Sequence, residues 1–194
     1  MIRALTICVL VLTVPRAAAA EWHLTPMIGE TFLGRTSIID LEAATDKHRK
    51  NLGGSVALMG SGVLGVEALV VWTPGFFQTG NQDLIKKSRT LALMGNVMVT
   101  APRRWTEYTL RPFVSGGFGL LNASRTEVAA VFPTTANMSG YNIGGGAIGF
   151  LSERTGLRFD LRYYNNLGGD PNAASIGPVQ LRYMTASVGL VLRR

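Results

Sequence analysis

The stretch Gly-Leu-Arg-Phe-Asp-Leu-Arg-Tyr-Tyr-Asn, residues 156–165, decides the fold of this chain. Its side chains alternate with a period of two, which is the pattern of an extended strand whose two faces meet different surroundings. One face carries Leu157, Phe159, Leu161 and Tyr163, and the other carries Arg158, Asp160 and Arg162. Three charges within five residues need water or a charge-paired interior on that side. The stretch therefore predicts one strand of a barrel or sandwich, with the Gly-rich run 141–150 as its hairpin partner.

Seven further strand-like runs are separated by connections that alternate in length. We predict strands at 21–33, 54–60, 63–73, 90–100, 111–121, 139–150, 156–165 and 179–192. Long loops are expected at 34–53, 76–88, 122–138 and 166–178, and shorter connections at 61–62, 101–110 and 151–155. An up-and-down transmembrane barrel has this asymmetry, with long loops outside and short turns on the periplasmic side. The predicted fold is therefore all-β, an eight-stranded antiparallel up-and-down transmembrane β-barrel.

The first twenty residues have the pattern of a secretory signal peptide. Arg3 precedes an apolar stretch at 4–14, and Ala18-Ala19-Ala20 offers a cleavage site. A membrane anchor would need a longer apolar run of about 18 residues or more. We predict cleavage after Ala20 and a single barrel domain at 21–194, from which the only cysteine, Cys8, has been removed.

Composition and charge set limits on the function. Hydrophobic residues make up 47% of the chain and charged residues 16%, which argues against a disordered chain. The net charge of +7 falls to +5 once Arg3 and Arg16 are removed with the signal peptide. This modest excess suits contact with anionic lipid or polysaccharide and does not indicate nucleic acid as a partner.

Five charged side chains are the candidates for the interior of the barrel: Glu67, Arg111, Arg158, Asp160 and Arg162. The interior of an eight-stranded barrel is just wide enough for side chains to fill, and buried charges there have to be paired. We interpret the set as a charge-paired lumen network, and the alternative is a narrow path for ions or small solutes. Glu67 and Asp160 could in form be a catalytic pair of carboxylates, but nothing else assembles an acid–base site around them.

Other chemistry is weakly represented. The only histidines, His23 and His48, are expected at opposite ends of the barrel, so no metal site is predicted. His48 with Glu42 or Asp46 is interpreted as a solvated loop. The Gly-rich runs lack the Lys-Ser/Thr of a phosphate-binding loop. We therefore predict no catalytic residues and no cofactor.

Two surface features fit a membrane setting. Aromatic residues near the predicted strand ends suggest girdles at the two membrane interfaces; they are Trp22, Trp72, Phe76, Phe77, Trp105, Tyr108, Tyr163, Tyr164 and Tyr183. Basic residues at 47–50 and at Lys86, Lys87 and Arg89 are expected near the outer rim. They are either a solvated face or a contact for the phosphates of lipopolysaccharide.

The chain resembles the bacterial outer-membrane β-barrel domain proteins, of the small OmpA/OmpX-like eight-stranded kind. The resemblance covers nearly all of 21–194. The matching pieces are Met-Gly-Ser-Gly-Val-Leu-Gly-Val-Glu (59–67), Met-Gly-Asn (94–96), Arg-Pro-Phe-Val-Ser-Gly-Gly-Phe-Gly-Leu-Leu (111–121), Gly-Gly-Gly (144–146) and Leu-Arg-Phe-Asp-Leu-Arg-Tyr (157–163). The resemblance implies location in the outer membrane of a Gram-negative bacterium and insertion by the barrel assembly machinery, and it does not imply one activity. We expect a monomer surrounded by lipid and lipopolysaccharide, with a structural, surface-interaction or limited porin-like role rather than an enzymatic one. One departure is the ending Leu192-Arg193-Arg194, where such barrels usually end in an aromatic residue.

Two other classes of protein remain as alternatives. A soluble periplasmic barrel of lipocalin type would bind a hydrophobic ligand and would invert the faces, with Phe159 and Leu161 inside and Arg158 in water. A lipid-modifying barrel enzyme lacks a plausible catalytic triad.

Overall fold

A computed structural model describes residues 20–36, 48–60, 62–76, 85–102, 110–127, 134–168 and 181–194. Residues 1–19 of the predicted signal peptide (1–20) lie outside these ranges, and its cleavage after Ala20 stays a prediction. The described residues form eight strands: β1 (Glu21–Thr36), β2 (Arg49–Met59), β3 (Leu64–Pro74), β4 (Ile85–Thr100), β5 (Leu110–Glu127), β6 (Thr134–Phe150), β7 (Thr155–Asn166) and β8 (Leu181–Arg193). No helix long and apolar enough to cross a membrane occurs in the described ranges.

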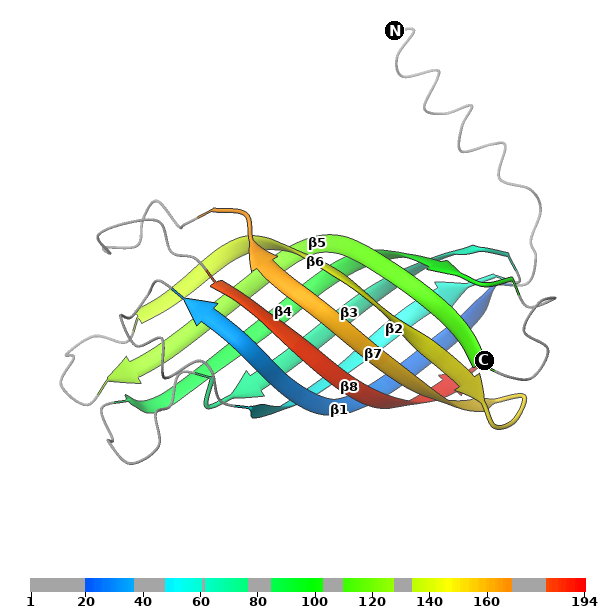
Figure 1. Ribbon diagram of the computed structural model, residues 1–194, viewed down its shortest axis with the longest axis horizontal. Helices are drawn as coiled ribbons and strands as arrows, with labels where there is room; N and C mark the ends of the chain where they lie inside the picture. The colour runs from blue at the N-terminus through cyan, green and yellow to red at the C-terminus, as the bar shows by residue number, and fades with distance from the viewer. Residues whose placement is uncertain are drawn as a thin grey trace, which may run out of the picture.

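The strands close into a barrel in which each pairs antiparallel with the next along the chain, and β1 pairs with β8. Figure 1 shows the strands crossing the long axis obliquely, with the C-terminus at the same end as the start of β1. The closure reaches the last residue, since Trp22 N donates to Arg194 O at 3.0 Å. A closed barrel leaves no strand edge, which is the condition for crossing a bilayer. The predicted fold is confirmed.

Several strands are longer at the long-loop end than predicted. β5 ends at Glu127 rather than at residue 121, and β4 and β6 begin at Ile85 and Thr134 rather than at residues 90 and 139. β2 begins at Arg49 rather than at residue 54. Gly53 and Gly54, which pattern reasoning assigned to the end of a loop or the start of a strand, lie in the middle of β2. A Cβ added at Gly53 would lie 2.7 Å from Val70 O, so glycine allows the close approach of β3 at this point. Arg49 and Lys50, expected in the loop, are therefore strand residues at the outer end of the barrel wall.

The two faces of each strand are sharply separated by exposure. Phe159 and Leu161 on β7 are 50% and 48% exposed, whereas Arg158 is 1% exposed. The same alternation runs along β3, where every second residue from Gly65 to Thr73 is buried. The apolar side chains therefore form an outer band and the charged ones line the lumen. The lipocalin alternative, which requires the opposite arrangement, is wrong.

The aromatic residues divide between the two faces. Trp22 and Trp72 point outward and are 55% and 40% exposed, as a girdle requires. The girdle prediction is wrong for Phe76, Tyr164 and Tyr183, which are buried in the lumen. Tyr163 and Tyr164 are neighbours in one strand and must face opposite sides, so no girdle can use both. Phe77, Trp105 and Tyr108 lie outside the described residues.

Side chains fill the interior in two apolar clusters, one towards each end. The cluster near the long-loop end contains Met27, Leu69, Val71, Phe76, Ala92, Met94, Leu121, Ala123, Met138, Tyr164, Leu181 and Tyr183. The cluster near the short-turn end contains Ala57, Met59, Met98, Phe113, Ile148 and Val191. Charged side chains occupy the section between them, and this section is the candidate site.

Candidate functional site

Four charged side chains form a closed ring of ion pairs across the lumen, called here the lumen ring: Glu67, Arg158, Asp160 and Arg162. Arg158 Nη1 lies 2.6 Å from Glu67 Oε1, and Arg158 Nη2 lies 2.6 Å from Asp160 Oδ2. Arg162 Nε lies 2.7 Å from Asp160 Oδ1, and Arg162 Nη2 lies 2.7 Å from Glu67 Oε2. Each charge therefore touches two opposite charges, and the ring is neutral as a whole.

The ring follows from the geometry of two strands. On β7 the residues at i, i+2 and i+4 face the lumen about 7 Å apart, so Asp160 stands between two arginines and binds both. Glu67 points inward from β3, which lies four strands away around the barrel wall, on the opposite side. The long arginine side chains span the distance, and their planar guanidinium groups hold both carboxylates at once.

Amide and hydroxyl side chains hold the ring in place. Asn96 Nδ2 donates to Glu67 Oε2 at 2.9 Å, and Asn142 Nδ2 donates to Asn96 Oδ1 at 2.7 Å. Arg162 Nη1 donates to Asn142 Oδ1 at 3.1 Å, which closes a second circuit beside the ion pairs. Ser55 Oγ accepts from Arg158 Nη1 at 3.2 Å. The predicted lumen network did not include Ser55, Asn96 or Asn142. The sequence signal that could have identified Asn96 is its position as a lone amide on the strand face opposite a row of apolar residues.

Glycines provide the room that the ring occupies. Gly144 lies directly opposite Arg162 in the β6–β7 ladder, and a Cβ there would stand 2.5 Å from Arg162 Cγ. Gly117 lies opposite Asn96 in the β4–β5 ladder, where a Cβ would stand 2.5 Å from Asn96 Oδ1. The Gly-rich runs of the sequence therefore serve packing inside the barrel, because bulky polar groups on one strand need an empty position on the next.

Arg111, the fifth residue predicted for the network, makes its hydrogen bonds at the short-turn end. Its Nη2 donates to Gly62 O at 2.9 Å and to Thr100 Oγ1 at 2.7 Å, and its Nε donates to Ala101 O at 2.8 Å. It thereby ties the β2–β3 turn to the end of β4. Strand alternation predicts that a side chain faces the lumen, but it does not predict how far along the barrel its partners lie.

The lumen ring is shielded from solvent. The side chains of Glu67 and Asp160 are 0% and 4% exposed, and those of the two arginines 1% and 2%. The guanidinium of Arg158 also stacks on Phe113, with Cζ 4.6 Å from the ring centroid, where the short-turn cluster begins. Buried charges in such surroundings are stable only as a paired set, because a lone charge would lack both water and a counter-charge.

The two histidines lie at opposite ends of the barrel. His23 is buried at the short-turn end, with Nε2 3.7 Å from Glu21 Oε2 and its ring edge-to-face with Phe150. His48 lies at the long-loop end, with Nδ1 3.2 Å from Glu30 Oε2 and its ring stacked on Phe32. Within the ranges described, no group of three or more His, Cys, Asp or Glu side chains could hold a metal ion. Glu42 and Asp46 lie outside those ranges.

Comparison with known proteins identifies the class of the fold. No family model matches the chain, and no curated protein matches its sequence. The solved structure of Neisserial surface protein A has a TM-score of 0.60 at 10% identity, covering 89% of this chain and 96% of that one. OprG from Pseudomonas aeruginosa has a TM-score of 0.58 at 14% identity, covering 91% and 96%. Ail of Yersinia pestis has a TM-score of 0.56 at 11% identity, covering 90% and 99%.

These likenesses concern the fold. The closed eight-stranded barrel, with its apolar outer band and charged lumen, has the fold of these solved bacterial outer-membrane barrels. The lumen ring is a property of this chain's own residues, and its role is considered next.

Proposed function

We propose that this protein is an outer-membrane barrel with a sealed lumen, which serves as a membrane anchor for four outer loops that make contacts at the cell surface. The observation that carries the proposal is the lumen ring, a neutral set of ion pairs held between two apolar clusters. The limited solute pore suggested by the sequence is the second candidate.

Sealing follows from what fills the cross-section. Conduction needs polar groups that ions can reach along the whole path. Towards the long-loop end the stacked rings of Tyr164 and Tyr183, with centroids 4.8 Å apart, are 0% and 1% exposed. At the same end Asn51 Nδ2 donates to Thr31 Oγ1 at 3.0 Å, and Thr31 Oγ1 lies 3.0 Å from Thr73 Oγ1. The arginines and carboxylates of the lumen ring are likewise occupied by each other.

Surface contact is supported by the layout of the connections. Four of them join strands at the end away from the C-terminus, namely β1–β2, β3–β4, β5–β6 and β7–β8 (Figure 1). Among the similar structures, one is described as a surface protein and another as an attachment invasion locus protein. Those descriptions belong to these relatives, and they agree with a rigid barrel that presents loops.

The remaining parts of the proposal concern export and partners. The chain is exported with cleavage after Ala20, inserted by the barrel assembly machinery, and surrounded by lipid and lipopolysaccharide as a monomer. A catalytic role is not proposed, because the carboxylates of Glu67 and Asp160 are buried and each is held between two guanidinium groups.

The test is conductance after proof of folding. The protein is extracted from the outer-membrane fraction and run unheated and heated on a gel, where a folded barrel changes mobility on heating. It is then reconstituted into planar bilayers, with a general porin as a positive control. We expect the folded protein to give no sustained channels. Stable channels in the unmodified protein would reject the sealed barrel and favour the solute pore.

A further inference from the structure

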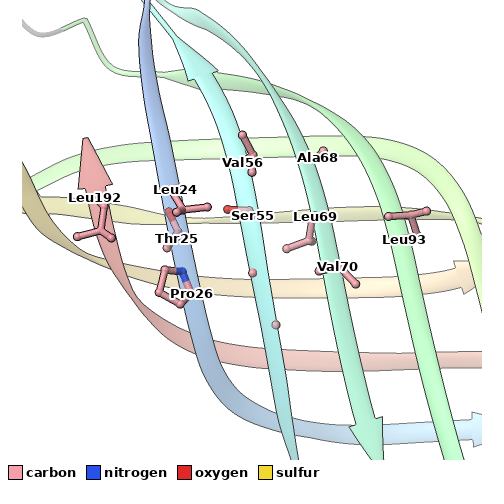
Figure 2. A pocket seen from close by; sticks show the side chains of 12 residues that line it. Leu24, Thr25, Pro26, Ser55, Val56, Ala68, Leu69, Val70, Leu93 and Leu192 are labelled. Carbon is pink, nitrogen blue, oxygen red and sulfur yellow. The ribbon is translucent and has the colours of Figure 1, made fainter. Parts of the chain in front are cut away.

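The outer wall of the barrel has a hollow of about 510 Å³ centred on β2. Figure 2 shows it from close by, with β2 running between β1 and β3. Next to Ser55 on β2 stand Gly53 and Gly54, which have no side chain, and the next outward residue is Leu52. Its rim is formed by outward-facing apolar residues of five strands, Leu24, Pro26, Val56, Val70, Leu93 and Leu192. The hollow is thus part of the band that faces lipid.

Gly54 produces the hollow, and the barrel itself does not require glycine there. In the ladders Gly54 lies between Pro26 on β1 and Val70 on β3, both of which point outward. The nearest atom to a Cβ added at Gly54 is Thr25 O at 3.6 Å, an ordinary contact. Gly53 next to it differs, since a Cβ would stand 2.7 Å from Val70 O. Packing within the barrel therefore requires glycine at position 53. It does not require glycine at position 54, so the reason for that glycine has to lie in what contacts the outer wall.

Two cations stand at the long-loop end of the same wall. Lys50 is on the outward row of β2, four residues from Gly54 and so about 13 Å along the strand. Arg89 is on the outward row of β4, four residues from Leu93 in the same direction. Only β3 separates the two strands, so the two backbones are about 10 Å apart. Both side chains are exposed, and neither makes an ion pair with another described residue.

The surroundings of these cations favour an anion from the outer leaflet. Glu30, opposite Lys50 on β1, is engaged by His48 Nδ1 at 3.2 Å. The exposed indole of Trp72 on β3 lies near the level of these two cations, which indicates that this level is the membrane interface. At the other end of the hollow the outward rows of β2 and β3 continue with Leu58 and Leu64. The end of the hollow with Lys50 and Arg89 is therefore the end at the outer leaflet.

We propose that the hollow at Gly54 seats one acyl chain of an outer-leaflet lipid whose phosphate is bound by Lys50 and Arg89, and that this lipid is the lipid A part of lipopolysaccharide. The inference rests on the proposed location in the outer membrane. Lipid tails are as apolar as the barrel wall, so the hollow contributes close packing and not a hydrophobic driving force. The affinity comes mainly from the two cations at the headgroup level.

The experiment measures lipid A retained by the folded protein. The full chain is expressed in a Gram-negative host, purified in mild detergent and analysed by native mass spectrometry. We expect one retained lipid A per barrel. Gly54→Leu fills the hollow and should lower the retained fraction by about fivefold, because the chain loses its close contacts. Lys50→Gln with Arg89→Gln should weaken retention by about thirtyfold, from the loss of two headgroup cations.

The matched control is Gly116→Leu. Gly116 also points outward, between Val97 and Ile143, and a Cβ there would meet Asn142 O at 3.5 Å, so a side chain is tolerated equally well. This variant should retain lipid A like the unmodified protein. Gel mobility before and after heating shows that each variant is folded.

Three results would overturn the proposal. These are equal retention of lipid A by folded Gly54→Leu, retention of phospholipid in place of lipid A, and occupation of the face by a second copy of the chain, seen as a dimer that Gly54→Leu abolishes. The proposed function fails separately, by absence from the outer-membrane fraction or by stable channels. A sealed outer-membrane barrel that retains no lipid A rejects only the acyl-chain seat.

Discussion

The guanidinium of Arg162 on β7 lies 2.7 Å from the carboxylate of Glu67 on β3, and these two strands stand on opposite sides of the barrel. The pair ties the two walls together through the middle of the lumen. Each partner also binds another ion, since Arg162 contacts Asp160 and Glu67 contacts Arg158. Changes at either residue should therefore affect the whole lumen ring.

Removing one charge of the ring should destabilise the barrel strongly. We expect Arg162→Met to lower the free energy of unfolding by about 3–5 kcal/mol, because Glu67 and Asp160 are left with an uncompensated buried charge. Urea unfolding in lipid vesicles, followed by tryptophan fluorescence, measures the change. Arg182→Met on the outward face of β8 is the control and should change stability by no more than about 0.5 kcal/mol. Equal losses for the two variants would contradict the role assigned to the ring.

Removing an opposite pair of charges should be milder than the single changes imply. Glu67→Gln with Arg162→Gln leaves Arg158 paired with Asp160 at 2.6 Å, so the lumen stays neutral. We expect the double variant to lose less stability than the sum of the two single variants, by about 0.5–3 kcal/mol. A double-mutant cycle in the same unfolding assay tests this. Simple additivity would show that the two residues act independently.

A methyl group at Gly144 should disturb the ring from the neighbouring strand. Its Cβ would lie 2.5 Å from both Arg162 Cγ and Leu161 O, so backbone as well as side chain must move. We expect Gly144→Ala to destabilise by about 1–3 kcal/mol, in the range of overpacked cores. Gly95→Ala is the control, since its Cβ would lie 3.8 Å from Phe118 O. If Gly144→Ala has the same free energy of unfolding as the unmodified protein, the backbone of β6 and β7 can shift at this point without cost.

Trp72 should report the level of the membrane interface. A variant that keeps only this tryptophan, made with Trp22→Phe and Trp105→Phe, is placed in vesicles of brominated lipid. We expect bromines near the headgroup to quench Trp72 more than bromines deep in the acyl chains, because girdle residues lie at the interface. Stronger quenching by deep bromines would place the apolar band differently, and absence of quenching by either would remove Trp72 from the lipid-facing wall.

Much of the wall was predictable from alternation alone. Alternation correctly put Leu161 on the outer face and Glu67 and Asp160 inside, because side-chain direction in a strand depends only on parity. Strand ends were less predictable, as the start of β2 shows. Glycine is a loop signal in open structures, yet in a small barrel it also fills positions where a neighbouring strand or side chain needs the space.

The lumen ring was predictable in membership but not in geometry. Parity indicates that Arg111 and Arg158 both face inward, and only the stagger of the strands shows that Arg111 binds the carbonyls of a turn while Arg158 reaches Glu67. The same limit applies to Asn142, an inward amide with no pattern of its own. Contacts across the barrel join residues as far as 95 and 103 positions apart, and no local signal in one sequence records them.

The pairing of β1 with β8 has a consequence for biogenesis. Trp22 bonds to Arg194, so the barrel closes by joining its first and last strands, which lie far apart in the sequence. Non-local contacts of this kind make folding slow, and until they form every partial sheet has an edge that lipid cannot satisfy. Insertion therefore cannot proceed hairpin by hairpin in bare lipid. The chain has to be kept from aggregating until β8 is available to pair with β1, and a truncation within β8 should abolish assembly altogether instead of weakening it.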